Sequence, residues 1–175
     1  ILGIPKEKVK VVLMPNGGGF GGKEDISVQG HAALFSYLLQ APVRVALTRP
    51  ESLCMHPKRH PMNMEMTLGC NKKGKLTFVR TNIIGDTGAY ASVGMKVLER
   101  AAGHATSVYS IPIVNIQSKA VYTNNVPCGA MRGFGVNQIN FAIESCLDEL
   151  CTQGGFDRWQ IRYDNAIKPG ERTST

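Results

Sequence analysis

The chain has 175 residues, of which 43% are hydrophobic and 19% are charged, so it is able to bury a core as one domain or one large lobe. The net charge is +7, but the positive residues are scattered and no basic stripe is interleaved with aromatic residues, which argues against nucleic-acid binding. The longest apolar run, around residues 32–39, is far too short to cross a bilayer.

The first predicted element is a strand over residues 8–14, which alternates in character and is rich in β-branched residues. The glycine-rich loop Pro15–Lys23 follows, and Asp25 is then placed to cap a helix that runs to about Gln40. That helix is apolar on nearly every side, so we expect it to be buried. Val43–Thr48 is predicted as another short strand.

The middle of the chain predicts a β-hairpin. Residues 62–68 alternate between apolar and polar side chains, as a half-buried strand does. Residues 71–74 have turn chemistry, and Lys75–Ile84 returns as the second strand. A loop of small residues, Gly85–Val93, then leads to a helix predicted over Met95–Val108.

The last third predicts a strand at Ile113–Tyr122 and a second glycine-containing loop at Asn124–Gly135. Apolar residues between Ile139 and Leu150 fall at helical spacing, and a pair of glycines ends that helix. A short helix is predicted at Asp157–Asn165. Strands and helices mix without strict alternation, so the predicted fold class is α+β (mixed α/β).

The domain prediction is a single segment of a larger domain over residues 1–168, followed by a disordered polar tail at 169–175. The opening Ile1–Pro5 reads like the end of a helix and a turn, which indicates a piece of a longer chain. Five cysteines without a CxxC pair, and no secretory signal, favour reduced thiols in a cytoplasm and argue against a zinc or iron–sulfur site within the chain. The four histidines are interpreted as structural.

The glycine-rich loop leaves three interpretations open. Gly17 followed by Gly22 and Lys23 matches most of a P-loop, but Glu24 stands where a P-loop needs a hydroxyl for magnesium, and its carboxylate would repel phosphates. A plain flexible turn does not need Phe20 among five glycines. The third interpretation is a cofactor loop, whose glycine backbone comes close to a bound group.

The segment Gly17–Glu24 closely resembles the cofactor loop of the xanthine dehydrogenase and aldehyde oxidase family of molybdenum hydroxylases. Residues 128–135 resemble the second cofactor loop of that family, with Met131 where the family usually has Phe. Leu98–Ala101 resembles a segment that carries a substrate-facing arginine. The three segments occur in the family order, and the resemblance covers about Val9–Lys168, which implies part of the molybdenum-cofactor-binding domain.

The resemblance implies roles for eight residues. Glu24 and Arg100 would face each other across the substrate as catalytic and substrate-binding groups, and Phe134 would abut the substrate ring. The ordinary alternatives are a helix N-terminal charge for Glu24, a surface arginine for Arg100 and core packing for Phe134. The cofactor would be held by Gly19, Phe20, Gly21, Met131 and Arg132, with molybdenum bound through the pterin dithiolene and not by this chain.

The resemblance also implies a reaction. A carbon next to nitrogen in an aromatic ring is hydroxylated with an oxygen from water, and electrons leave through iron–sulfur clusters and FAD on other domains or subunits. The acid–arginine pair favours a purine or related N-heterocycle over an aldehyde. The family's glutamate base, in a Gly-x-Gly-Glu context, is absent from these 175 residues, so we expect a fragment that binds cofactor and substrate without turnover.

The partners expected are the remaining molybdopterin-domain segments together with iron–sulfur and flavin subunits, in the cytoplasm, with no nucleic acid and no membrane. Two other functions stay open at this point. One is a P-loop-like nucleotide-binding domain, and the other is a non-catalytic scaffold subunit of a molybdoenzyme.

Overall fold

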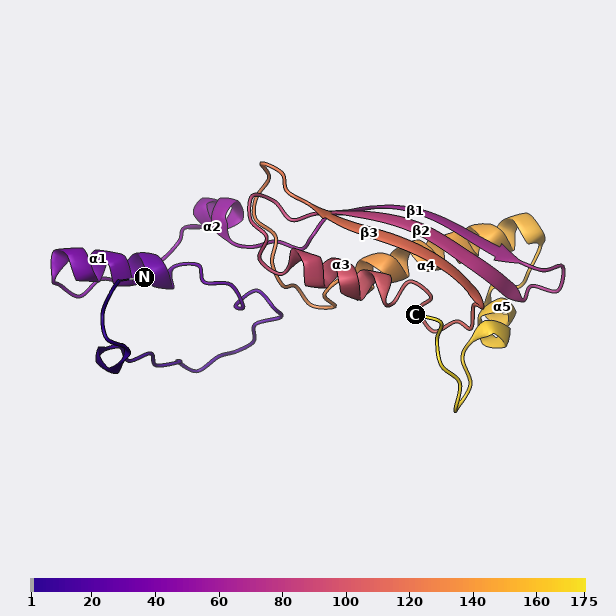
Figure 1. The fold of residues 1–175 in the computed structure, drawn as a ribbon, viewed down its shortest axis with the longest axis horizontal. Helices are drawn as coiled ribbons and strands as arrows, with labels where there is room; N and C mark the ends of the chain where they lie inside the picture. Colours follow the sequence, from indigo (N-terminus) through magenta and orange to yellow (C-terminus); the bar gives the residue numbers. More distant parts are fainter. Residues whose placement is uncertain (1) are drawn as a thin grey trace.

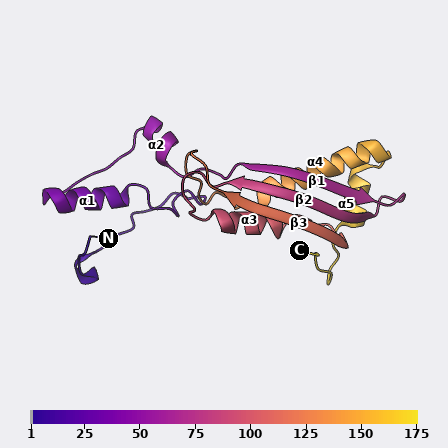
Figure 2. The same cartoon turned by 45° about the horizontal axis from the view of Figure 1, so that its top comes forward.

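The computed structural model describes residues 2–175, which form an N-terminal arm and a C-terminal lobe (Figures 1 and 2). The arm, residues 2–56, contains the 3-10 turn Lys6–Lys8 and the helices α1 (Gln29–Leu39) and α2 (Arg49–Met55). The lobe, residues 57–175, contains all three strands and the helices α3 to α5. None of the described residues of the arm is buried, so the whole core belongs to the lobe.

The predicted β-hairpin is confirmed. Strand β1 (Met62–Cys70) pairs antiparallel with β2 (Leu76–Asp86). In the turn between them, Asn71 Oδ1 accepts hydrogen bonds from the backbone N–H groups of Lys73 and Lys75 at 2.9 and 3.1 Å. Gly74 has a φ of 76°, which a residue with a Cβ rarely adopts, and this explains the glycine at the turn.

The third strand lies parallel to β2, giving the order β1-β2-β3. A parallel neighbour needs a crossover connection, and α3 (Gly94–Ala102) supplies it between β2 and β3 (Ile113–Val121). Helix α4 (Val136–Gly154) packs against β1 and α3, so α3 and α4 cover the same face of the sheet (Figure 1). Helix α5 (Arg158–Asn165) follows, with Asp157 as its N-cap.

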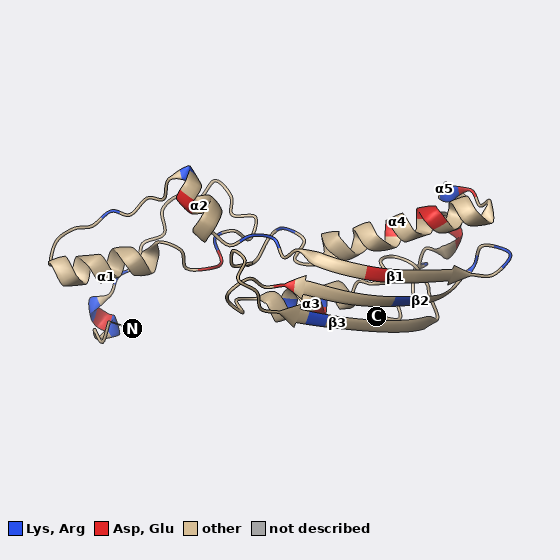
Figure 3. Ribbon diagram, turned by 90° about the horizontal axis from the view of Figure 1, so that it is seen from above, with Lys and Arg blue, Asp and Glu red and all other residues tan. Residues whose placement is uncertain are grey.

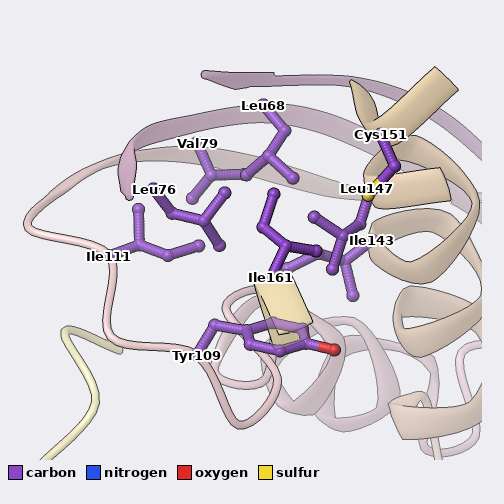
Figure 4. Close-up of a cluster of buried hydrophobic side chains, with 9 residues drawn as sticks. All are labelled: Leu68, Leu76, Val79, Tyr109, Ile111, Ile143, Leu147, Cys151 and Ile161. Carbon is purple, nitrogen blue, oxygen red and sulfur yellow. The ribbon is translucent and has the colours of Figure 1, made fainter. Parts of the chain in front are cut away.

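The core of the lobe lies between this sheet and its helices. Helix α4 contributes a stripe in which Ile139, Ile143, Leu147 and Cys151 recur every fourth residue and are all buried. One cluster lies toward α5 and the other toward α3. The members of the first are Leu68, Leu76, Val79, Tyr109, Ile111, Ile143, Leu147, Cys151 and Ile161 (Figure 4). The members of the second are Ile83, Val97, Leu98, Ala101, Ala105 and Ile139.

Both strands predicted in the arm are wrong. Residues 9–14 and 42–48 carry no strand pairing, although Val9 has extended backbone angles (φ −108°, ψ 120°). A strand is defined by a hydrogen-bonded neighbour, and the described residues provide none for either segment. The side chains are accordingly open to solvent, with Val11 89% and Leu13 86% exposed.

The predicted helix of the arm exists, but its start and its burial are wrong. It begins at Gln29, and Asp25 does not cap it, because Asp25 Oδ1 instead accepts a hydrogen bond from Ser92 Oγ at 2.6 Å. No residue of α1 is buried, and Leu38 is 65% exposed, because the described chain covers only the first turns of the helix, where Leu2, Ile4 and Val9 share a pocket with His31 and Leu34. Figure 3 shows that α1 also carries no charged residue.

Two further helix boundaries differ from the prediction. Helix α2 was not predicted, although Thr48 and Glu51 form a reciprocal capping box at its start. Helix α3 ends at Ala102, before Gly103, instead of at Val108. The mixed α+β class is confirmed, and no helix within residues 2–175 is long and apolar enough to span a membrane.

Candidate functional site

The two glycine-rich loops meet in space although they are far apart in the sequence. The backbone N–H of Arg132 donates to the carbonyl of Phe20 at 2.8 Å, and the Arg132 guanidinium lies 5.7 Å from the centre of the Phe20 ring. At Gly21, which has a φ of 90°, a Cβ would stand 2.9 Å from the carbonyl carbon of Ala130. Only glycine therefore permits this approach of the first loop to the second.

Both loops hold a phenylalanine in the left-handed backbone region. Phe20 has a φ of 50° and Phe134 a φ of 51°, and each is next to a glycine that is also left-handed. The left-handed conformation costs a residue with a Cβ about 1–2 kcal/mol. Such strain collects at ligand-binding sites, where the surrounding structure holds it. The strained backbone of the two aromatic residues makes the two loops a candidate site.

A cleft of about 580 Å³ opens where the loops meet, and we call it the loop cleft. Its walls combine glycine backbone, Phe20 and Met131 with the cationic side chains of Lys23, Arg59 and Arg132. No carboxylate is among the residues that line it, and the remaining lining residues are Gly19, Gly22 and His56. A site with this charge and open backbone suits an anionic ligand that carries a polar ring.

The second loop is held in place by the lobe. The carboxylate of Asp86, at the end of β2, accepts hydrogen bonds from Thr123 Oγ1, Asn125 Nδ2 and the backbone N–H of Gly88 at 2.6 to 2.7 Å. Led by the Asn125 hydrogen bond, these contacts hold the pKa of Asp86 below its usual value. Asp86 is therefore ionised at neutral pH and fixes the start of the loop.

The structure does not bring the predicted substrate pair into contact. Glu24 lies in the arm and Arg100 near the end of α3, both exposed, and no ion pair or hydrogen bond within residues 2–175 joins their side chains. Phe134 is half-buried, and part of its side chain packs against the core cluster of Ile83. Gly19, Phe20, Gly21, Met131 and Arg132 are the predicted residues that do meet.

The P-loop interpretation does not fit this geometry. A P-loop runs from a strand directly into a helix whose first N–H groups face the phosphates. Here residues 9–14 form no strand, and α1 begins at Gln29, five residues after Glu24 and therefore beyond the end of the loop.

The comparison with known families decides among the interpretations. A family model described as the molybdopterin cofactor-binding domain matches residues 1–166. The chain belongs to this family. It is 43% identical to the large molybdopterin subunit of nicotinate dehydrogenase from Eubacterium barkeri, over the whole chain and 41% of that protein. It is 41% identical to a probable xanthine dehydrogenase subunit of Bacillus subtilis, over 97% of this chain and 23% of that protein.

Solved structures agree with the family assignment. Aldehyde oxidoreductase from Desulfovibrio gigas superimposes with a TM-score of 0.85 at 29% identity, over 90% of this chain and 17% of that one. The chain spans less than half the length of each of these relatives. The family and the fold inferred from the loop motifs are confirmed.

Three residues of the loop cleft escaped the sequence reasoning: Lys23, His56 and Arg59. Lys23 lies within the segment Gly17–Glu24 that resembles the family cofactor loop, but no cofactor role was predicted for it. His56 and Arg59 lie in a segment without helical or strand periodicity, so no pattern ties them to either glycine loop.

The residues of the loop cleft fit a molybdopterin-type group in this family member. Three cations face the site without a compensating carboxylate, and the terminal Nη1 of Arg59 is buried with no hydrogen-bond partner among residues 2–175. An anionic pterin would supply the acceptor that Arg59 Nη1 lacks, and the glycine-lined wall would let it approach the backbone closely.

Proposed function

We propose that this chain is the part of a molybdenum hydroxylase that binds a molybdopterin-type cofactor and an N-heterocyclic substrate. The observation that carries the proposal is the junction of the two loops, in which Arg132 donates to Phe20 and lies over its ring beside a cationic cleft. Membership of the molybdopterin cofactor-binding domain family supports the same function.

The cofactor supplies the two-electron oxidation when it is bound, and the protein supplies binding and orientation. The backbone of Gly19, Phe20 and Gly21 offers polar groups to the cofactor without side chains in the way. Met131 and Arg132 form the facing wall, where the guanidinium is held by its contact with Phe20. The contacts between the two loops reduce the loop entropy that is lost when a ligand binds.

The proposed substrate is a purine or related aromatic N-heterocycle. Glu24 hydrogen-bonds a ring N–H or C=O, Arg100 stabilises the negative charge that builds on the ring, and Phe134 packs beside it. Relatives named nicotinate dehydrogenase and xanthine dehydrogenase support this class, since both names refer to aromatic N-heterocycles. Glu24 and Arg100 are both exposed and unpaired with each other in residues 2–175, so both are open to a ligand.

The proposed enzyme needs further protein segments as partners. Helix α1 exposes large apolar side chains, among them Leu34, Phe35, Leu38 and Leu39, that the described chain leaves uncovered. The longer relatives suggest that other molybdopterin-domain segments cover them. The glutamate base, the iron–sulfur clusters and FAD belong to those segments or to further subunits.

The proposal is tested on the intact enzyme that contains this chain. Metal analysis is expected to find molybdenum, and rates are compared for xanthine, hypoxanthine, nicotinate and an aldehyde. Arg100→Met is expected to lower kcat/KM on the preferred heterocycle by about a hundredfold, as loss of one charge-stabilising donor does, and to leave any aldehyde activity nearly unchanged. Arg80→Met, on the exposed outer face of β2, is the matched control.

Three results would contradict the proposal at different levels. An active enzyme without molybdenum would exclude the hydroxylase function altogether. Equal losses on heterocycle and aldehyde would exclude the substrate role of Arg100 while leaving the cofactor function in place. A molybdenum-loaded complex with no turnover on any heterocycle would favour a scaffold role.

A further inference from the structure

Arg59 has a buried donor without an acceptor. It lines the loop cleft, and its Nη1 has no hydrogen-bond partner among the described residues. A guanidinium stays charged at every physiological pH, so it cannot escape this situation by losing a proton. The other two cations of the cleft do have contacts, because Lys23 Nζ donates to Asn16 Oδ1 and Arg132 lies over the Phe20 ring.

The main chain on both sides of Arg59 is fixed to the lobe. The backbone N–H of Lys58 donates to the carbonyl of Pro127 at 3.0 Å, and the carbonyl of Lys58 accepts from Gly129 at 2.9 Å. On the other side, His60 is buried, and its carbonyl accepts from Gln138 Nε2 at 3.2 Å. The main chain of Arg59 is therefore held at the cleft by its neighbours, so little backbone freedom remains to be lost on binding.

The charge of the cleft indicates what the missing acceptor is. Lys23, Arg59 and Arg132 repel one another across a cleft without a carboxylate, so an anion that enters it stabilises all three. A guanidinium matches the geometry of a phosphate, with which it forms two parallel hydrogen bonds.

We propose that Arg59 positions the phosphate group of the pterin cofactor in the loop cleft. This inference rests on the proposed function, because it takes the cleft to be the cofactor site. Under this inference, three segments hold the cofactor. Two are the glycine loops, and the third is the Lys58–Pro61 segment, in which the charge of Arg59 binds the phosphate.

The test compares Arg59→Gln, Arg59→Lys and the control Arg80→Gln in the intact enzyme. Arg80→Gln removes the same charge from an exposed position on β2. The measurement is the rate at which molybdenum and pterin are lost during dialysis. Loss of a hydrogen bond to a charged group is expected to speed the release from Arg59→Gln about tenfold. The release rate of Arg59→Lys is expected to lie between those of Arg59→Gln and the wild type, because lysine keeps the charge but cannot form the two parallel hydrogen bonds of a guanidinium.

A second readout uses inorganic phosphate on the cofactor-free enzyme. Phosphate is expected to raise the melting temperature of the wild type and of Arg80→Gln but not that of Arg59→Gln. Equal cofactor retention in Arg59→Gln and Arg80→Gln overturns the inference. A cofactor-free Arg59→Gln that melts well below cofactor-free wild type also overturns it, because Arg59 then stabilises the fold without any cofactor. A wild-type enzyme without molybdenum and pterin refutes the proposed function instead.

Discussion

The arm and the lobe each carry one glycine loop of the site, yet they are built in opposite ways. The lobe buries a stripe of α4 against β1 and α3, and every buried residue of the described chain lies within it. The arm buries none, although α1 is as apolar as any segment of the sequence (Figures 1 and 2). The difference lies in the presence of a packing partner and not in the hydrophobicity of the helix.

This contrast shows where the stability of the chain comes from. Burial of apolar area provides the main free energy of folding, so the lobe contributes nearly all of it. The loop cleft lies where the arm reaches the lobe, and only a few contacts join them there. Among these are the hydrogen bond from Arg132 to Phe20 and the one from Ser92 to Asp25. The first glycine loop is therefore held by local contacts and by whatever binds in the cleft.

The largest expected effect separates the two regions directly. Leu147→Ala is expected to lower the free energy of unfolding by about 2–5 kcal/mol, because Leu147 is fully buried and leaves a cavity. In the 175-residue chain by itself, where no further segment covers α1, the same substitution at Leu38, which is 65% exposed, is expected to change it by less than about 0.5 kcal/mol. Urea unfolding of the two variants measures both values. A comparable loss at Leu38 would mean that α1 is packed in solution.

The next effect tests the junction between arm and lobe. Gly21→Ala forces a Cβ into a left-handed position 2.9 Å from the Ala130 carbonyl carbon, at a cost of about 1–3 kcal/mol. Gly17→Ala is the control in the same loop, because a Cβ there meets nothing within 4 Å. Limited proteolysis of the arm is expected to be faster in Gly21→Ala only. Identical digestion of both variants would show that the Gly21 contact does not hold the loop.

The parts of the fold that the sequence predicted correctly are those with a strong local pattern. The β-hairpin and its Asn71–Gly74 turn are examples, and so is the four-residue apolar repeat of α4. The two strands predicted in the arm fail for one physical reason. Residues 9–14 and 42–48 have the composition of strands, but strand formation depends on a hydrogen-bonded neighbour that a local pattern does not contain.

The residues of the candidate site show the same difference between local patterns and distant partners. The glycine loops were found because their motifs are local, and the structure brings Phe20 next to Arg132. Arg59 was missed because its place in the cleft depends on the pairing of Lys58 with Cys128, which no spacing in the sequence reveals. The substrate roles of Glu24 and Arg100 stay predictions, since no ion pair or hydrogen bond among residues 2–175 joins their side chains.

The smallest expected effect concerns the pH dependence of the lobe beside the junction. Burial holds the pKa of His60 below its usual value, although Asp25 and Asp86 act in the opposite direction. The unfolded chain therefore binds more protons than the folded one as pH falls through about 6.5, so stability is present at higher pH and lost on acidification. His60→Gln is expected to flatten the fall in melting temperature between pH 7 and pH 5, whereas His104→Gln, at an exposed position, is expected to leave it unchanged. A slope that His60→Gln leaves intact would place the titrating group elsewhere.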